Sequence, residues 1–472
     1  MESNIEDFAD KAISHALDLK CHYCDVRAEI ITKEGLVIEN GQIEHTVSMF
    51  DRGLGIRVLN DGAWGFFSVS NPSSIAEIIA ATDAAVSSAR YYTKKQKIRL
   101  ASIPTIKDKI VFPVRKEPDI EELAKIGFDC DKIIHEKKRI IKSSVSIGYS
   151  KTKKYFANSE GSKITQEYAD VVSELSATAH ESGLTQSVDS TEGGRGGIEK
   201  LSDEKDIFDT AKFVSEMSSN LIDAKPASEE KATVVMNPDF VALLTHEILG
   251  HPSEADRVLG KEMAWAGGAW WAGNIGKQIG SQNLDVFDDP TISGSLGWYG
   301  YDDEGVKSSK TSLIENGILV NHMQNRETAE IFNAKPSANM RATSYKFMPL
   351  IRMACTCIGK GDWNPQEMIR DVKSGYLVSN MKVPSIDMKR YNWSISCQFA
   401  QKIENGELTD LLRDVIVIGT APDFFKSIDA CGKDFTVRPI TNCGKGDPMQ
   451  SMIMGNGGPT IRAVATVKSV KS

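Results

Sequence analysis

The chain is 472 residues long, with 41% hydrophobic and 25% charged residues, an ordinary composition for a globular protein in water. This length predicts two or three domains and ample chain to bury a core. The formal net charge of −8 argues against a nucleic-acid-binding surface, and no apolar run approaches the length that crosses a bilayer. The N-terminus MESNIEDFADKA lacks the pattern of a signal peptide, so we expect a cytoplasmic protein without nucleic-acid or membrane partners.

The eight cysteines are scattered along the chain and form no disulfide framework, which is typical of a reducing compartment. Cys21 and Cys24 form a CxxC pair, but no second pair accompanies it, so a redox or metal role is disfavoured. Cys355 and Cys357 alternate in an apolar, strand-like run. Most of the cysteines are therefore predicted to be core residues.

The first half of the chain alternates helical and strand-like patterns. A helix is predicted over 5–19, followed by strands that turn at Asn40-Gly41 and at Asn60-Asp61-Gly62, two strong hairpin signals. A second helix is predicted over 75–92, after an early proline. The pattern predicts a unit of helices on an antiparallel sheet.

A similar order recurs further along the chain. A helix predicted over 120–141 leads into strands that turn at 158–161, which suggests a diverged internal duplication. The glycine-rich segment 190–197 is predicted to be a loop, and no Lys-Ser/Thr follows it to make a phosphate site. The polar stretch 224–230 breaks the periodicity, so we place a domain boundary there and predict domains over residues 1–225 and 226–472.

The second domain opens with a strand and then Asn237-Pro238, a helix start. From residue 284 onward, short β-like segments are broken by glycines, with turns such as Asn316-Gly317 and Asn405-Gly406. The predicted fold class is α+β. It has an N-terminal helix-plus-antiparallel-sheet domain and a mainly β, curled or barrel-like C-terminal domain that carries the helix begun at Asn237-Pro238.

That helix holds His246 and His251 in the sequence HEILGH, two of only eight histidines. Zinc-protease helices place two histidines four residues apart on one face, with a glutamate as general base. Here the spacing is five, and five residues of regular α-helix leave the second imidazole about 140° from the first. Gly250 and Pro252 weaken regular helical geometry, so we predict a π-type turn or a helix end that swings His251 back over His246.

A catalytic zinc ion normally has three protein ligands and an open position for water, so the third ligand must come from elsewhere. The best candidate by chemistry is Cys443, in a glycine-flanked TNCGKG loop whose basic and amide groups favour a thiolate. Glu254 or Asp256, just beyond His251, could accept a hydrogen bond from the free ring nitrogen of a histidine ligand. The alternative for these two carboxylates is an exposed charged segment.

Five motifs together resemble the TldD/PmbA family of metallopeptidases. They are HEILGH, DDEG at 302–305, NRETA at 325–329, NCGKG and GNGGPT. The resemblance is strong over the second half of the chain and weak over the first, and HExxxH with CGKG is specific to the metal-bearing TldD branch. It implies His246, His251 and Cys443 as zinc ligands and Glu247 as catalytic base. Three residues match the motifs without an assigned role: Asp302, Asp303 and Arg326.

The resemblance implies a zinc-dependent peptidase that acts on unfolded or extended polypeptides inside a closed dimer cavity. The dimer would be a homodimer or a heterodimer with a TldE/PmbA-like paralogue. Two alternatives stay open: a zinc amidohydrolase of a non-peptide substrate, and a non-catalytic regulatory or binding protein with a structural zinc. The intact Glu247 disfavours the last, because a structural site typically takes a closed four-ligand shell and has no use for a base.

Two features stay without a firm role. The segment that contains Trp265, Trp270 and Trp271 is predicted to be either a lid for apolar peptide side chains or a core plug or interface. His322 is predicted to be a structural or substrate-side residue rather than a fourth ligand.

Overall fold

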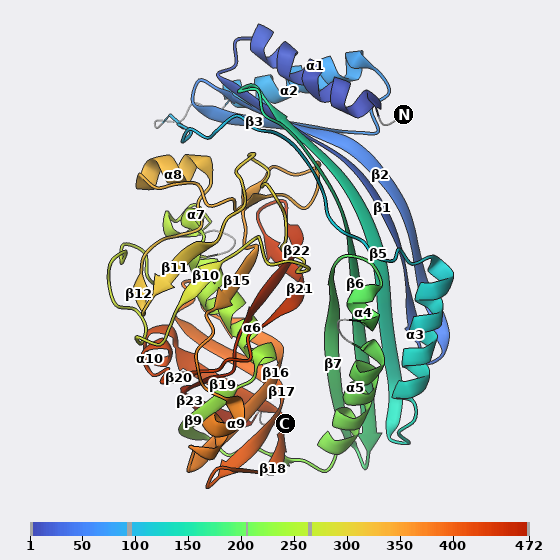
Figure 1. The fold of residues 1–472 in the computed structure, drawn as a ribbon, viewed down its shortest axis with the longest axis vertical. Coiled ribbons are helices and arrows are strands. Elements are labelled where there is room, and N and C mark those ends of the chain that lie inside the picture. The colour runs from blue at the N-terminus through green and yellow to red at the C-terminus, as the bar shows by residue number, and fades with distance from the viewer. Residues whose placement is uncertain (1–2, 92–96, 204–205, 263–266, 470–472) are drawn as a thin grey trace.

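A strongly curved sheet dominates the first half of the computed structural model, which describes residues 3–91, 97–203, 206–262 and 267–469. Its long strands arc beside the second half of the chain, with α1 and α2 gathered at one end (Figure 1). The elements are α1 (Ser3–Asp18), β1 (Tyr23–Glu39), β2 (Gln42–Asn60), β3 (Ala63–Ser70), α2 (Ile75–Tyr91), β4 (Lys107–Val111), α3 (Ile120–Ile134), β5 (Ile140–Asn158), β6 (Lys163–Glu181), β7 (Leu184–Arg195), α4 (Glu199–Ser202) and α5 (Ile207–Leu221).

The curved sheet consists of two units of the same order. Its strands run β3-β2-β1-β5-β6-β4, with β7 also paired to β6. The first unit is α1 followed by the antiparallel strands β1, β2 and β3, and the second is α3 followed by β5, β6 and β7. They meet where β1 pairs antiparallel with β5. This repeated order supports the internal duplication, which stays a prediction.

Two predicted boundaries in this half were wrong. The helix predicted over 120–141 ends at Ile134, because a turn follows and Ile140 already pairs in β5. The segment 190–197 is not a loop throughout, since β7 pairs with β6 as far as Arg195. A Cβ atom on Gly193 would lie 2.1 Å from the carbonyl oxygen of Val171. Glycine there allows a close approach of two strands rather than a turn.

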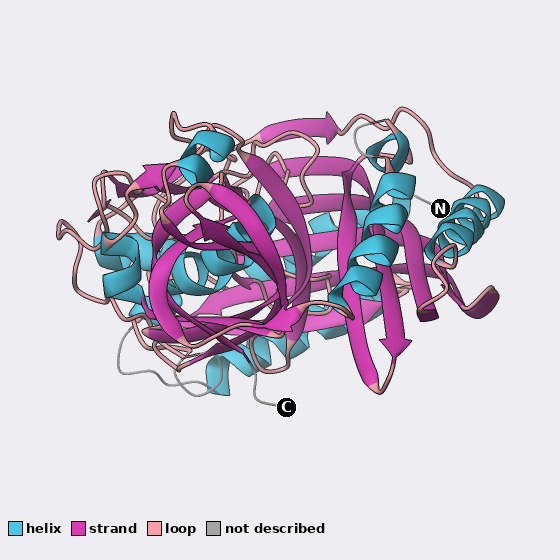
Figure 2. Ribbon diagram, turned by 90° about the horizontal axis from the view of Figure 1, so that it is seen from below, coloured by secondary structure: helices cyan, strands magenta, loops and turns pink. Residues whose placement is uncertain are grey.

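The second half of the chain combines a closed barrel with a six-stranded sheet. Strands β16, β9, β23, β19 and β17 pair in that order, and β16 also pairs with β17, which closes a five-stranded barrel (Figure 2). The other sheet runs β12-β11-β10-β15-β22-β21, so β21 is an edge strand. The predicted α+β class with a barrel-like C-terminal part is confirmed.

The elements of the second half up to residue 358 are β8 (Lys225–Pro226), β9 (Glu230–Met236), α6 (Pro238–Leu244), a π-helix (Thr245–Gly250), a 3-10 turn (His251–Ser253), α7 (Ala255–Val258), β10 (Val286–Asp288), β11 (Thr311–Glu315), β12 (Ile318–Leu319), α8 (Arg326–Phe332), β13 (Met340–Arg341), β14 (Leu350–Ile351) and β15 (Cys355–Ile358). The remaining elements are α9 (Pro365–Arg370), β16 (Ser374–Ile386), β17 (Asn392–Glu404), β18 (Glu407–Arg413), β19 (Val415–Thr420), α10 (Ala421–Lys426), β20 (Ala430–Cys431), β21 (Thr436–Lys445), β22 (Gln450–Gly458) and β23 (Ile461–Ser469).

The chain joins the barrel sheet at β8, which pairs with β18. The division into domains 1–225 and 226–472 stays a prediction that this change of sheet supports.

The tryptophan segment contributes to the core of the second half. Trp271 is fully buried, and its indole nitrogen donates a 2.7 Å hydrogen bond to the carbonyl oxygen of Pro252. Trp270 is half-buried and packs against the Trp271 ring. Trp265 lies outside the described residues. For Trp271 the structure therefore supports the core plug rather than the lid.

The DDEG and NRETA motifs join the two halves of the molecule. Asp303 accepts a 2.8 Å hydrogen bond from Lys154 of β5, and Glu304 binds Arg57 of β2 at 3.0 Å. Arg326 forms a two-pronged ion pair with Glu160, with both hydrogen bonds at 2.8 Å. The Asp302 carboxylate instead accepts backbone N–H groups of its own segment and of Met340. Asp303, Glu304 and Arg326 therefore hold the C-terminal half against the curved sheet, whereas Asp302 orders its own half.

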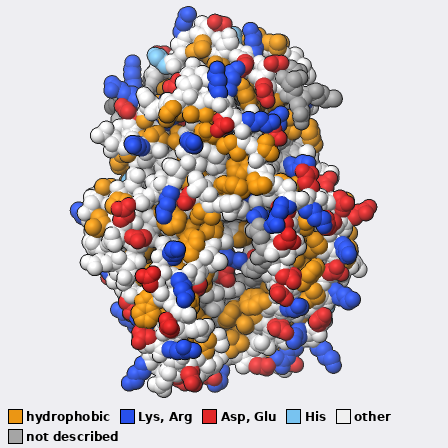
Figure 3. Space-filling view, viewed as in Figure 1, with side chains coloured by type: hydrophobic (Ala, Val, Ile, Leu, Met, Phe, Trp, Pro, Cys, Tyr) orange, Lys and Arg blue, Asp and Glu red, His pale blue; other side chains and the backbone are white. Residues whose placement is uncertain are grey.

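The surface carries charges of both signs. On the face drawn in Figure 3, Lys and Arg side chains are interspersed with Asp and Glu, and hydrophobic side chains lie between them. Among the described residues, every helix is too short or too polar to span a membrane.

Candidate metal centre

The two histidines lie on a helix that changes its winding between them. Asn237 caps α6 by accepting a 3.0 Å hydrogen bond from the Phe240 N–H. The helix then continues as a π-helix, and the His251 N–H bonds to the His246 carbonyl oxygen, five residues back. The wider turn places both imidazoles on one side, as the five-residue spacing predicts. The predicted π-type turn is confirmed.

Gly250 has a different role from the expected one. Its dihedrals, φ −67° and ψ −60°, are helical, so this position does not require the conformational freedom of glycine. A Cβ atom at Gly250 would instead lie 2.1 Å from the sulfur of Met353. A side chain at this position would therefore have to displace Met353, which packs directly on the helix backbone.

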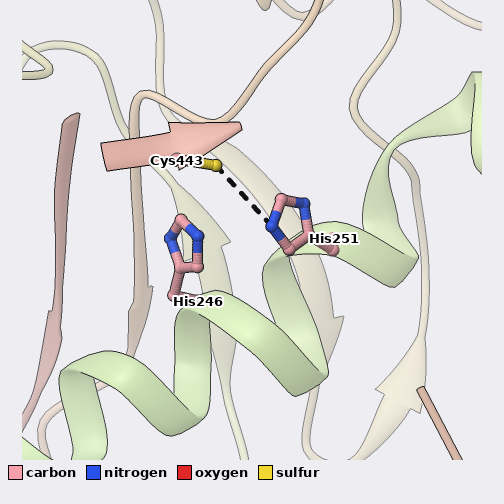
Figure 4. A group of neighbouring side chains, drawn as sticks. All are labelled: His246, His251 and Cys443. Carbon is pink, nitrogen blue, oxygen red and sulfur yellow. Dashed lines mark hydrogen bonds between the residues drawn. The ribbon is translucent and has the colours of Figure 1, made fainter. Parts of the chain in front are cut away.

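His246, His251 and Cys443 converge, with one potential ligand atom from each within 4.8 Å of the others. All three side chains are buried and point toward one another (Figure 4). The Cys443 sulfur lies 3.6 Å from Nε2 of His251, and the two imidazole rings have centroids 4.7 Å apart. Cys443 is not in a loop as predicted: it belongs to edge strand β21, just after an irregularity in the pairing with β22.

Each imidazole has a partner for Nδ1 on the side away from the cysteine. Nδ1 of His246 lies 3.0 Å from Oδ1 of Asn456, and Nδ1 of His251 lies 3.3 Å from Oε2 of Glu254. Nη2 of Arg257, which can only donate, also lies 3.2 Å from Nδ1 of His251. In the tautomer whose Nδ1–H is donated to the Asn456 or Glu254 oxygen, Nε2 is left free as a ligand. Glu254 therefore fits the predicted role of a carboxylate that orients a histidine.

The alternative of an exposed charged segment is wrong for both carboxylates, which are buried. Glu254 binds Arg257 and lies 3.2 Å from Nζ of Lys445. Asp256 does not contact a histidine; it accepts hydrogen bonds of 2.7 and 2.8 Å from Lys445. Burial would raise the pKa of Glu254, but the charges of Lys445 and Arg257 hold it well below its usual value. The carboxylate therefore stays ionised beside His251.

The electrostatics favour a thiolate. Burial raises the pKa of Cys443, but the His246 and His251 imidazoles outweigh it and hold the pKa well below that of a free thiol. Burial lowers the pKa of His246, yet the thiolate of Cys443 raises it to about 9. These shifts favour a thiolate on Cys443 and an imidazolium on His246 when no metal is bound, and a divalent cation would replace the proton between them.

Glu247 lies beside the cluster but outside it. Its carboxylate is 3.5 Å from Nη1 of Arg390, and its side chain is 16% exposed. Burial raises its pKa, but His251, His246 and Arg390 outweigh this and lower it, so the carboxylate is ionised. Glu247 therefore faces the adjoining cleft as an ionised carboxylate paired with Arg390.

That cleft has a volume of about 610 Å³ and runs between the two halves of the molecule. The curved sheet contributes Glu174, Asp189 and Thr191, and the other wall contains the three clustered residues, Glu247 and Arg390. A ligand in the cleft would thus touch the cluster and Glu247 together.

The donor set fits a zinc ion. Two neutral imidazoles and a thiolate are ligands that Zn²⁺ prefers, and three protein ligands leave the fourth position open. The three side chains line the cleft, and the partners of the two imidazole Nδ1 atoms match the usual surroundings of histidine ligands. The ligand assignment remains a prediction that this geometry supports.

His322 is not part of the cluster, in line with its predicted structural role. It is buried, both its ring nitrogens lack a hydrogen-bond partner among the described residues, and its ring packs against Phe332. Burial lowers its pKa to about 4, so the imidazole is neutral near pH 7.

Two residues of the site were missed by sequence reasoning. Asn456 belongs to the quoted GNGGPT motif, so a signal was present without an assigned role. Arg390 lies in a polar turn between β16 and β17 with nothing in its neighbourhood to single it out.

Family models match three parts of the chain. They are described as PmbA/TldA metallopeptidase domain 1 over residues 24–89, central domain over 115–222 and C-terminal domain over 229–467. A metalloprotease of Methanocaldococcus jannaschii is 34% identical over 453 residues, which cover 94% of this chain and 96% of the relative. A zinc metalloprotease TldD homolog of Saccharolobus solfataricus is 28% identical over 472 residues, 96% of this chain and 97% of its own.

Solved structures share the fold. A candidate modulator of a DNA gyrase from Thermotoga maritima has a TM-score of 0.81 at 17% identity, covering 98% of this chain and 99% of its own. TldE from Thermococcus kodakarensis has a TM-score of 0.76 at 17% identity, covering 98% and 100%. With the family models and the 34% identical metalloprotease, these findings show that the chain belongs to the PmbA/TldD family of metallopeptidases, as its motifs predict.

Proposed function

We propose that this protein is a zinc-dependent peptidase with His246, His251 and Cys443 as zinc ligands and Glu247 as general base. The observation that carries the proposal is the convergence of three ligand atoms within 4.8 Å at a cleft that Glu247 also lines. The names of the relatives support a metalloprotease, and one of them is named a zinc metalloprotease.

The chemistry follows from these groups. A Zn²⁺ ion held by the three residues would lower the pKa of a coordinated water and polarise the peptide carbonyl. Glu247 takes a proton as water attacks and returns it to the leaving amine. Asn456 and Glu254 fix the ring orientations through Nδ1, and burial keeps bulk water from the thiolate.

The cleft supports unfolded or extended polypeptides as substrates. Its volume of about 610 Å³ accommodates a few residues of an extended chain, whereas a folded domain is far larger. Both walls carry polar and charged groups, which suit a peptide backbone. A zinc amidohydrolase of a non-peptide substrate would use the same groups, so the substrate test below separates the two.

We also propose that the protein works in the cytoplasm as a dimer, with a second copy or with a TldE-like paralogue. Support comes from β2: among the residues that the structure describes, the strand partner of its residues 42–52 is β1 alone, since β3 pairs with β2 from Gly53 onward. This edge exposes apolar side chains, with Val47 48% and Phe50 66% exposed. An unpaired apolar strand edge favours pairing with another chain.

The test of the proposal is the variant Glu247→Gln. It should keep zinc and the fold, because Glu247 is not among the converging ligands. It should lose hydrolysis of an unstructured casein peptide by about 10²- to 10⁴-fold, the usual contribution of a general base. The measurement is peptide cleavage by chromatography, with zinc content as the control and a compact folded protein as the resistant substrate.

Undiminished cleavage by the Gln variant would reject Glu247 as the base. No cleavage of peptide by the zinc-loaded wild type, alone or with a TldE-like partner, would favour a non-catalytic protein with structural zinc. Cleavage of small amides but not of peptides would favour the amidohydrolase.

A further inference from the structure

Arg390 brings a cation to the proposed reaction site from outside the histidine and cysteine motifs. It lies in the turn between β16 and β17, and its side chain is 16% exposed. Nη1 lies 3.5 Å from the Glu247 carboxylate, and the residue lines the same cleft. The guanidinium therefore lies beside the proposed base, on the wall of the cleft.

The guanidinium of Arg390 has hydrogen-bond donors to spare. Within the described part of the chain it donates no hydrogen bond, and its buried Nε has no partner. The buried Arg195 shows the usual arrangement: it donates bonds of 2.8 and 3.1 Å to Asp170. Because a buried donor without a hydrogen-bond partner is costly, the partnerless Nε of Arg390 points to a ligand that enters the cleft.

The backbone at Arg390 is held in an unfavourable conformation. Its φ is +62°, a left-handed value that a side chain with a Cβ atom rarely adopts. The Asp387 carboxylate holds the turn, accepting hydrogen bonds of 2.9 Å from the Lys389 and Tyr391 N–H groups and 2.8 Å from Asn392. Such conformations persist where the surroundings enforce them, and they cluster at functional sites.

We propose that Arg390 is a catalytic residue that donates hydrogen bonds to the oxyanion formed during peptide hydrolysis, an inference that rests on the proposed function. As the oxygen of water bonds to the carbonyl carbon, the π electron pair moves to the carbonyl oxygen and Glu247 takes the proton. The guanidinium N–H groups bind that negative oxygen. The electron pair then re-forms the C=O bond, the C–N bond breaks, and the amine leaves with the proton from Glu247.

The position of Arg390 favours the oxyanion over a terminal carboxylate of the substrate. Its Nη1 is beside the base, and the base must be beside the carbonyl under attack. A donor at that place stabilises the transition state more than the substrate, and removing one such donor typically costs about 10²- to 10³-fold in rate.

The test compares two non-hydrolysable peptides of one sequence by calorimetric titration: a phosphinic peptide, which mimics the tetrahedral adduct, and a ketomethylene peptide, which keeps the planar carbonyl. Arg390→Met should lower the affinity for the phosphinic peptide by about 10²-fold or more, and the affinity for the ketomethylene peptide by less than about threefold. Arg390→Lys should recover part of the loss. The matched control is Lys389→Met, which removes an exposed cation from the same turn and should change neither affinity. Metal analysis should give equal zinc in all variants.

A second pair of variants separates a direct role from a role through Glu247. In the Glu247→Gln background, Arg390→Met should still lower the affinity for the phosphinic peptide more than the affinity for the ketomethylene peptide. Loss of that effect, equal weakening of both peptides, or no weakening would each overturn the inference. If the zinc-loaded wild type neither binds the phosphinic peptide nor cleaves peptides, the proposed function falls, and this inference falls with it.

Discussion

At the scale of single residues, the sequence alone singled out the three residues of the cluster. His246 and His251 stand out by their rarity and by the glutamate between them, and Cys443 stands out among the cysteines by its polar, glycine-rich neighbours. Asn456 and Arg390 could not be placed this way. They reach the site through the pairing of β22 with β15 and the turn after β16, which are contacts between distant parts of the chain.

Asn456 provides a test at this scale. Asn456→Ala removes the acceptor for Nδ1 of His246, so the imidazole loses its fixed orientation. We expect zinc affinity to fall by about 10- to 100-fold, the usual effect of losing such a partner. Competition with a chromophoric chelator measures it. Asn456→Asp keeps an acceptor oxygen and should bind zinc nearly as the wild type does; equal affinity in Asn456→Ala would show that the hydrogen bond does not orient the ring.

At the scale of elements, the sequence predicted a structure correctly where a few neighbouring residues determine it. The five-residue histidine spacing, with Gly250 and Pro252, predicted a π-type turn or a helix end, of which the structure has the π-helix. The Asn-Gly turns predicted hairpins, and both predictions depend on neighbouring residues alone. The end of α3 and the continuation of β7 were mispredicted. At Gly193 the deciding contact is with Val171 of β6, which local composition does not reveal.

The free edge of β2 provides the test at this scale. Phe50→Lys places a charge on the unpaired edge, so a dimer formed there should dissociate, whether the partner is a copy or a TldE-like chain. Light scattering should give the mass of a dimer for the wild type and of a monomer for the variant. Ile75→Lys, on an α2 position that is 53% exposed, is the control and should stay dimeric. This edge would be excluded as the dimer interface if Phe50→Lys stayed dimeric, or if the wild type were monomeric both with and without the paralogue.

At the scale of the molecule, the proposed site exists only because the two halves meet. Glu174, Asp189 and Thr191 of the curved sheet form one wall of the cleft, and the cluster lies in the other. Ion pairs of the DDEG and NRETA motifs join the halves, and the pair between Glu304 and Arg57 is fully buried. The sequence predicted each half but not their arrangement, because these pairs link residues far apart in the chain.

Glu304 tests how the halves are joined. Glu304→Ala leaves Arg57 buried without one of its two carboxylate partners and frees the Arg326 N–H. Breaking a buried pair typically costs about 3–5 kcal/mol, so the midpoint of urea unfolding should fall markedly. Lys346→Met is the control: its ion pair with Asp51 also links the halves, but Lys346 is 45% exposed, so the change should be about 1 kcal/mol or less. Equal shifts of the unfolding midpoint in the two variants would show that the buried pair stabilises the protein no more than the exposed pair does.

The central claim is that His246, His251 and Cys443 hold one catalytic zinc. Zinc-edge X-ray absorption of the purified protein and of Cys443→Ala tests it most directly. The account predicts about one zinc per chain, with nitrogen ligands at roughly 2.0–2.1 Å and one sulfur at roughly 2.3 Å that disappears in Cys443→Ala. A wild-type spectrum without sulfur, or an unchanged sulfur signal in Cys443→Ala, would contradict it.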